Sequence, residues 1–193
     1  ELIVVSSQGG VNFYIGNNPA SDGKTAVAPG SQREIGEYRD NVWVASQAVA
    51  EEELGRELGA SEVSSYWFGK GFRYWLDSPA DALGLLMKKG YYFFHGYEIP
   101  NNVDPYFSRE WSWILRLLLW PRFLFLPFGL IGPLGLLGIA LWLRGRVPRS
   151  TEGSQVFSLL LLFGGSYAAA VILFFVSARF RLPTVPVFVV FAA

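Results

Sequence analysis

The sequence has no cysteine and a single histidine among 193 residues. It therefore forms no disulfide, offers no thiolate nucleophile and supplies no cysteine ligand to a metal. The lack of cysteine leaves the compartment open, because a domain outside the cytoplasm does not need disulfides. No HExxH or GxSxG motif and no cluster of metal-ligand residues occurs, so no cofactor is identified and metal dependence stays open.

Acidic residues are nearly absent from the second half. Residues 1–110 hold 15 of the 16 acidic residues and 9 basic ones, a net charge of −6. Residues 111–193 hold Glu152 alone against 7 arginines, a net charge of +6. This asymmetry predicts a polar, mildly acidic domain joined to a basic membrane region. Because the chain starts at Glu1 and stops inside an apolar run, we expect a piece of a longer protein.

Two long runs carry no charge. Residues 123–143 and 156–177 contain 21 and 22 residues without a charged side chain. A spanning helix needs about 20 apolar residues, because the hydrocarbon core is about 30 Å thick. Both runs therefore predict transmembrane helices, and residues 183–193 predict the start of a third. Glycines and prolines in the first run indicate a kinked, closely packed helix.

Before these two uncharged runs, the sequence contains both strand-like and helix-like patterns of apolar residues. Residues 2–5 and 11–15 predict two short strands or extended segments in a loop-rich region that reaches about residue 40. Apolar spacing then predicts helices over about 41–58, 61–76 and 79–94. The last begins with Ser78 as N-cap and Pro79 at the first helical position.

The expected fold is mainly α: a polytopic helical membrane protein with a small, mostly helical extracytoplasmic segment. Residues 106–122 are rich in tryptophan, tyrosine and phenylalanine, which predicts an interfacial helix at the headgroup level. In chain order the expected parts are the extracytoplasmic segment 1–105, the interfacial helix 106–122, the spans 123–143 and 156–177 joined by a cytoplasmic loop 144–155, the outer loop 178–182, and the truncated span 183–193.

Charge does not orient these spans. The loop of residues 144–155 holds three arginines. The opposite side holds four close to the spans: Arg116, Arg122, Arg179 and Arg181. The positive-inside rule therefore does not decide the orientation of the spans.

Two other functional classes, proteins with a phosphate-binding loop and nucleic-acid-binding proteins, are excluded. Gly23-Lys24-Thr25 lacks the earlier glycine of a phosphate-binding loop, and the aromatic residues lack the interleaved lysines of a nucleic-acid platform.

Residues 9–19 read GGVNFYIGNNP and are followed by Asp22-Gly23. This stretch resembles the bacterial membrane glycosyltransferases related to protein O-mannosyltransferases and to the aminoarabinose transferase of lipid A. Three later features agree with that family: the helix of residues 62–75 that leads into Ser78-Pro79, the following helix that ends near Tyr97-Glu98, and residues 178–183, ARFRLP, which open a late span. The resemblance covers most of the chain.

The resemblance implies a polytopic enzyme of the bacterial inner or plasma membrane. It takes a sugar from a polyprenyl-phosphate donor and gives it to an acceptor on the extracytoplasmic face. The sugar and the acceptor, a glycan, lipid or protein, are not specified. An acidic catalytic base in the first outer loop is expected upstream of residue 1, so no catalytic residue is named here. The resemblance also implies that residues 1–122 lie outside, with Arg179 and Arg181.

Several residues are candidates for the site under that orientation. Arg179 and Arg181 break the positive-inside bias, and their planar guanidinium groups suit the donor phosphate; the alternative is that they anchor helix ends among headgroups. Asn12, Asn17 and Asn18 offer amides to a sugar or phosphate, or simply form a turn. Glu98, beside His95, is a candidate for acceptor binding, or His95 is merely packed. Lys88 and Lys89 are expected to contact lipid headgroups, with binding of the donor as the alternative.

A second hypothesis belongs to another class. The same pattern of helices and loops fits a non-enzymatic polytopic membrane protein, a transporter or scaffold. An aspartate or Asp-Glu pair in the first outer loop of the upstream sequence supports the enzyme, whereas paired discontinuous helices there support transport.

Overall fold

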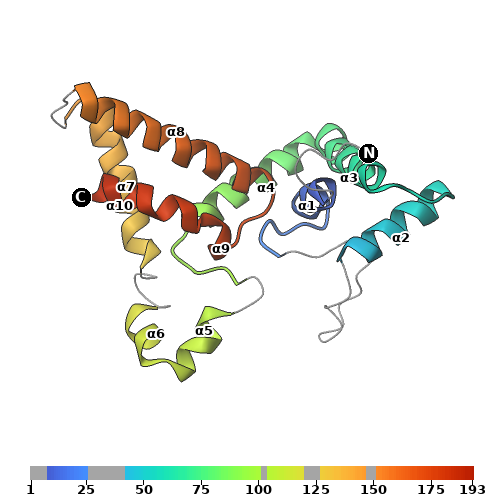
Figure 1. Ribbon diagram of the computed structural model, residues 1–193, viewed down its shortest axis with the longest axis horizontal. Coiled ribbons are helices and arrows are strands. Elements are labelled where there is room, and N and C mark those ends of the chain that lie inside the picture. The colour runs from blue at the N-terminus through green and yellow to red at the C-terminus, as the bar shows by residue number, and fades with distance from the viewer. Residues whose placement is uncertain (1–7, 26–41, 101–103, 120–126, 147–150) are drawn as a thin grey trace. The chain divides into compact units, whose positions relative to one another are not determined.

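The computed structural model describes residues 8–25, 42–100, 104–119, 127–146 and 151–193. Within these ranges every regular element is a helix and no strand is present, so the prediction of a mainly α-helical chain is confirmed (Figure 1). The chain divides into two compact units. The first comprises Glu1–Lys89 with Leu173–Phe175, and the second comprises Gly90–Ile172 with Val176–Ala193.

The first helix, α1 (Gly9–Gly16), occupies the place where residues 11–15 predicted a strand. That prediction is wrong, because a short apolar run does not distinguish a strand from a buried helix and tertiary packing decides. A β-carbon at Gly10 would lie 1.8 Å from the carbonyl oxygen of Ser64, so only glycine allows α1 to lie this close to its neighbour. The other predicted strand, residues 2–5, lies outside the described residues.

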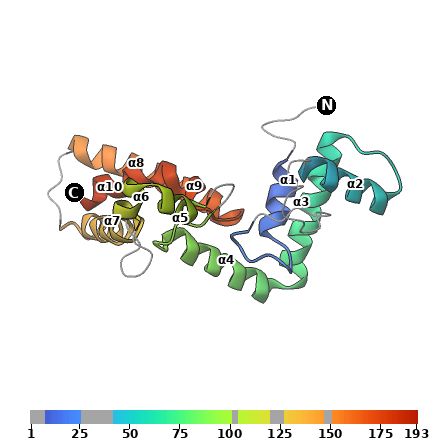
Figure 2. The same cartoon turned by 90° about the horizontal axis from the view of Figure 1, so that it is seen from below.

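Two helices follow close to their predicted positions. They are α2 (Val42–Leu54) and α3 (Ala60–Asp77), where residues 41–58 and 61–76 were expected. The first ends four residues early because Gly55 adopts a φ of +67°, a left-handed conformation that terminates helices and favours glycine. Helices α1 and α3 lie side by side in both views (Figures 1 and 2).

Helix α4 (Pro79–Phe94) has the bounds that the sequence predicted. Proline suits the first turn because its missing N–H has no intrahelical partner there. The carbonyl oxygen of Ser78 accepts the first bond, from the N–H of Ala82, at 3.0 Å. Helix α4 begins in the first unit and ends in the second.

The predicted interfacial helix of residues 106–122 is broken into three short pieces. They are α5 (Pro105–Ser108), η1 (Arg109–Trp111) and α6 (Trp113–Leu118). The break falls at Ser112, whose extended backbone starts α6 and whose hydroxyl accepts a hydrogen bond from the N–H of Leu115 at 3.4 Å. A serine N-cap of this kind begins a new helix. Residues 120–122 lie outside the described ranges.

Helices α7 (Phe128–Leu143) and α10 (Val185–Ala192) pack against each other in the second unit. A β-carbon at Gly138 would lie 1.6 Å from the carbonyl oxygen of Phe191. The close packing predicted from the glycines of α7 is therefore confirmed. Residues 123–126 of the predicted span lie outside the described residues.

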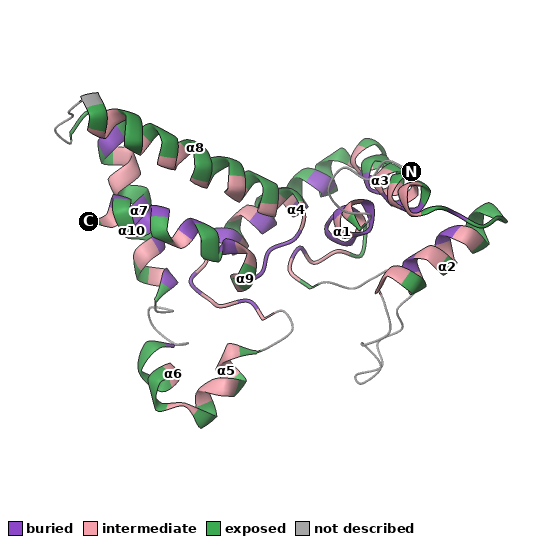
Figure 3. Cartoon of the chain, in the orientation of Figure 1, coloured by how far each residue is buried: buried purple, intermediate pink, exposed green. Residues whose placement is uncertain are grey.

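Helix α8 (Thr151–Leu173) starts five residues before the predicted span of residues 156–177 and ends four residues before its end. Thr151–Gln155, expected in a loop, are thus helical. By length and composition, α8 is the one helix among the described residues that could cross a bilayer. Its surface is mostly exposed or half-buried along its length (Figure 3).

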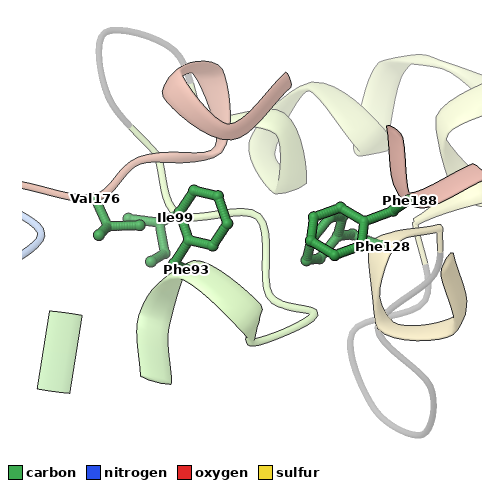
Figure 4. Packing of buried hydrophobic residues seen from close by; sticks show 5 residues of the cluster. All are labelled: Phe93, Ile99, Phe128, Val176 and Phe188. Carbon is green, nitrogen blue, oxygen red and sulfur yellow. The ribbon is translucent and has the colours of Figure 1, made fainter. Parts of the chain in front are cut away.

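The predicted outer loop of residues 178–182 is instead the short helix α9 (Ala178–Arg181), which continues into η2 (Leu182–Thr184). Thr184 stabilises the junction between α9 and η2, because its hydroxyl donates to the carbonyl oxygen of Arg181 at 2.7 Å. The second unit also contains a hydrophobic cluster drawn from α4, α7, α10 and the segments that follow α4 and α8 (Figure 4). Its buried members are Phe93, Ile99, Phe128, Val176 and Phe188.

Candidate functional site

Asn17, at the end of α1, is fully enclosed by the first unit, with 1% of its surface exposed. Its Nδ2 donates to the carbonyl oxygens of Phe13 and Leu173, both at 2.8 Å. Its Oδ1 accepts from Trp75 Nε1 at 3.0 Å and from Lys89 Nζ at 3.1 Å. A primary amide has two N–H donors and one oxygen with two lone pairs. The protein itself therefore uses the whole hydrogen-bonding capacity of Asn17.

The ammonium group of Lys89 lies among four oxygen atoms, and the residue has no exposed surface. Its Nζ donates to the carbonyl oxygens of Gly16 at 3.0 Å, Leu173 at 3.2 Å and Phe174 at 3.0 Å, as well as to Asn17 Oδ1. None of these oxygens belongs to a carboxylate. Burial without a counter-charge lowers the pKa of Lys89 from 10.5 to about 8.

The four oxygens come from the ends of two helices. Gly16 is the last residue of α1, and Leu173 is the last residue of α8. The last carbonyl groups of a helix have no intrahelical partner and carry a partial negative charge, so a cation is favourable there. Lys89 thus provides one donor group that caps both helix ends.

Two glycines make room for this arrangement. A β-carbon at Gly16 would lie 1.8 Å from the carbonyl oxygen of Phe174, and one at Gly23 would lie 2.7 Å from Cγ of Lys89. Gly23 also has a φ of +82°, which favours glycine. The glycines of the sequence motif therefore allow the backbone and the lysine stem to approach closely.

The two other asparagine candidates differ from Asn17. Asn18 closes a turn: its Nδ2 donates to the carbonyl oxygens of Tyr14 at 2.7 Å and Ile15 at 3.2 Å, and its Oδ1 accepts from the N–H of Ala20 at 2.9 Å. The turn interpretation of Asn18 matches this geometry. Asn12 is half-buried on α1, and within the described residues its side chain makes no hydrogen bond.

Arg181, a candidate for the donor phosphate, is 2% exposed and is paired inside the second unit. Its Nη2 lies 2.8 Å from Oε2 of Glu98 and 3.3 Å from the carbonyl oxygen of Tyr97. Its Nη1 donates to the carbonyl oxygens of Phe93 and His95, at the end of α4. Both terminal nitrogens are therefore engaged by the protein, and the phosphate role of Arg181 requires these partners to be displaced.

The guanidinium of Arg181 also lies over an aromatic ring. Its Cζ is 4.0 Å from the ring centroid of Phe128, the arrangement of a cation–π contact. Glu98, the candidate for acceptor binding, makes a second contact besides the ion pair. Its backbone N–H donates to the hydroxyl of Tyr106 at 3.0 Å. The structure thus brings two separate predicted candidates, Arg181 and Glu98, into one ion pair.

Arg179 differs from Arg181 although both belong to α9. It is exposed to solvent, whereas Arg181 points into the unit. His95 accepts a hydrogen bond at Nδ1 from the N–H of Tyr97 at 3.1 Å, in keeping with a packing role at the end of α4. Of the candidates for an anion, Arg179 is the arginine that a ligand can reach without displacing protein groups.

Lys89 corrects one prediction. Lys88 is exposed, but Lys89 is fully buried and cannot contact lipid headgroups as expected. A signal for this was present in the sequence. Ala82, Leu85 and Phe93 are buried on α4 at spacings that place Lys89 on the same helix face. Nothing in the sequence indicated that Trp75 or Gly23 would lie beside Lys89 or Asn17.

No group of three or more His, Asp or Glu side chains in the described ranges is placed to hold a metal ion. The described candidates form two separate networks: amide, carbonyl and ammonium groups around Lys89 in the first unit, and a guanidinium, a carboxylate and carbonyl groups around Arg181 in the second. Comparisons with protein-family models, with curated proteins and with solved structures found no match.

Proposed function

We propose that the chain is the C-terminal part of an integral membrane glycosyltransferase that moves a sugar from a polyprenyl-phosphate donor to an acceptor on the extracytoplasmic face. One observation carries the proposal. The motif of residues 9–19 is hydrogen-bonded to the end of α8 through Asn17 and Lys89. If α8 spans the membrane, as we propose, the motif lies near the interface where the phosphate of a lipid donor would be bound.

The surface of α8 supports insertion into a bilayer. Leu159, Leu162 and Phe163 are all at least half exposed on it. The serine hydroxyls facing outward are satisfied within the helix, since Ser158 donates to the carbonyl oxygen of Ser154 at 2.8 Å and Ser166 donates to that of Phe163 at 3.0 Å. Lipid offers no hydrogen bonds, so a spanning helix must satisfy its polar groups internally.

The segment from α5 to α6 supports contact with the membrane surface. Trp111 and Trp113 are 81% and 75% exposed, and tryptophan concentrates at the headgroup level of bilayers. Arg116 steadies the segment, because its Nε donates to the carbonyl oxygen of Arg109 at 3.3 Å and its Nη2 to that of Glu110. In the proposal this segment lies at the outer interface.

The reaction forms a bond between the acceptor oxygen and the anomeric carbon of the sugar and breaks the bond from that carbon to the phosphate oxygen. A carboxylate upstream of residue 1 takes the acceptor proton, and the polyprenyl phosphate leaves with the bonding electrons. Arg179 is the proposed contact to that phosphate, since a guanidinium binds phosphate oxygens bidentately.

The test uses the full-length protein in liposomes with polyprenyl-phosphate sugars labelled in the sugar. Transfer of label to an acceptor, with a donor KM raised about tenfold or more by Arg179→Ala, supports the proposal. Arg146→Ala is the matched control, because Arg146 is also exposed and lies beyond the other end of the spans. Absence of transfer from every such donor, together with passage of a solute across the liposome, would instead favour a transporter.

A further inference from the structure

Asn17, Lys89 and the end of α8 form one hydrogen-bond network inside the first unit. The partners are distant in sequence: 72 positions separate Asn17 from Lys89, 84 separate Lys89 from Leu173, and 156 separate Asn17 from Leu173. Such a network is a tertiary connection and not a local turn.

The network also leaves no place for an added ligand. Every donor and acceptor of the Asn17 amide is used, and Lys89 has no exposed surface. The glycines at positions 16 and 23 are in contact with backbone or lysine atoms, so neither lines an open space. A sugar or phosphate would have to break bonds that already satisfy buried groups, which costs the full desolvation of each group.

We propose that the Gly16–Asn17 turn together with Lys89 is a receptor for the C-terminal end of α8. In this role the turn binds a segment of its own chain and not a substrate, and Lys89 is the positioning residue that fixes Leu173 and Phe174. These hydrogen bonds do not depend on any enzymatic activity, whereas their effect on sugar transfer rests on the proposed function.

Removal of the lysine amine has a local and specific consequence. The carbonyl oxygen of Leu173 keeps the Asn17 Nδ2 donor, and Asn17 Oδ1 keeps the Trp75 donor. The carbonyl oxygens of Gly16 and Phe174 lose the hydrogen bond from Nζ. The end of α8 should therefore loosen at Phe174 while the packing of α1 on α3 persists.

The experiment is amide hydrogen exchange on the full-length protein in micelles, with Lys89→Met against Lys88→Met. Methionine keeps the length of the stem and removes the donors. A charge-assisted hydrogen bond of about 1.5–3 kcal/mol corresponds to roughly ten- to hundredfold faster exchange. We expect this at residues 173–177 in Lys89→Met and no change in Lys88→Met. Unchanged exchange at residues 173–177 in Lys89→Met, or equal acceleration over all of α2 and α3, overturns the proposal.

Two further variants keep the test decisive if Lys89→Met does not fold. Trp75→Phe removes one donor to Asn17 and retains an aromatic ring, so exchange at residues 173–177 should rise about two- to fivefold. Lys89→Arg restores charged donors and should bring exchange closer to wild type than Lys89→Met does. No effect of Trp75→Phe on that segment contradicts the receptor.

Sugar transfer, measured on the same variants, separates this inference from the proposed function. Faster exchange in Lys89→Met with kcat reduced about tenfold and donor KM nearly unchanged supports positioning. Faster exchange with unaltered transfer overturns the positioning role but not the receptor. Faster exchange in a protein whose wild type transfers no sugar leaves the receptor in place and rejects the enzyme.

Discussion

Among the described residues, each unit buries one basic side chain at a helix end, but the two are stabilised differently. Lys89 in the first unit contacts four neutral oxygens, whereas Arg181 in the second has a carboxylate, three carbonyl oxygens and an aromatic ring. An isolated buried charge is disfavoured, so Lys89 loses its proton more easily, while an arginine stays charged in proteins. The first site can change its charge with pH, and the second depends on its ion pair.

The largest expected loss of stability comes from breaking the ion pair between Arg181 and Glu98. Arg181→Met leaves Glu98 half-buried without its cation and removes the donors from three carbonyl groups. Removing one partner of a buried pair costs about 3–5 kcal/mol. Thermal unfolding of the full-length protein measures the loss, with Arg179→Met as the exposed control at less than about 0.5 kcal/mol.

A second substitution identifies the origin of the loss. Adding Glu98→Gln to Arg181→Met removes the unpaired charge and should recover part of the stability. If the double variant is no more stable than Arg181→Met alone, the carbonyl contacts and packing dominate and the ion pair contributes little.

The second effect is a dependence of stability on pH that arises from Lys89 and is measured as the difference between wild type and Lys89→Met. The folded pKa of Lys89, about 8, is below the unfolded value of 10.5. Between these values the unfolded chain binds more protons, so the free energy of unfolding rises with pH, by about 3 kcal/mol in all. Below about pH 7 both states are protonated and this contribution is flat. Denaturant unfolding from pH 7 to 10.5 should show the rise in wild type and lose it in Lys89→Met.

A third substitution tests the close approach that the lysine site requires. Gly16→Ala places a β-carbon 1.8 Å from the carbonyl oxygen of Phe174, which is backbone and must shift. We expect a loss of about 1–3 kcal/mol, as for other overpacked sites. Gly69→Ala on α3 is the control. No atom lies within 4 Å of its added β-carbon, and alanine should stabilise that helix by up to about 1 kcal/mol. Equal behaviour of the two variants would refute the contact.

The smallest expected loss of stability comes from changing Phe128, whose ring lies beneath the guanidinium of Arg181. Phe128→Leu keeps an apolar side chain in the cluster and removes the cation–π contact with Arg181. The contact itself is expected to contribute about 1 kcal/mol. A double-mutant cycle with Arg181→Met isolates it, and a coupling energy near zero would show that the ring is only packed there.

Local chemistry allowed much of the helical part to be predicted. Proline at position 79 gave the start of α4, and glycine at position 55 explains why α2 ends before the expected residue. The α1 helix could not be recognised, because a short, mainly apolar and aromatic run fits a strand as well as a buried helix. The packing on Ser64 that decides it involves residues over 50 positions away.

The site was only partly predictable for the same reason. Lys89 lies at helical spacing from buried residues, so its burial could have been read from α4. The partners of Arg181 could not, since the bonded carbonyl groups lie 84 to 88 positions earlier in the chain. The arginines of α9 were equivalent in the sequence, and only the fold distinguishes the exposed one from the paired one.

The oxygen shell of Lys89 has an order of assembly during synthesis. Gly16 and Asn17 precede the lysine, but Leu173 emerges 84 residues after it. At about 5–20 residues per second, the ribosome needs roughly 4–17 seconds to deliver that last part. Throughout this interval only the residues that supply two of the four oxygens have been synthesised, so the full shell requires the end of α8.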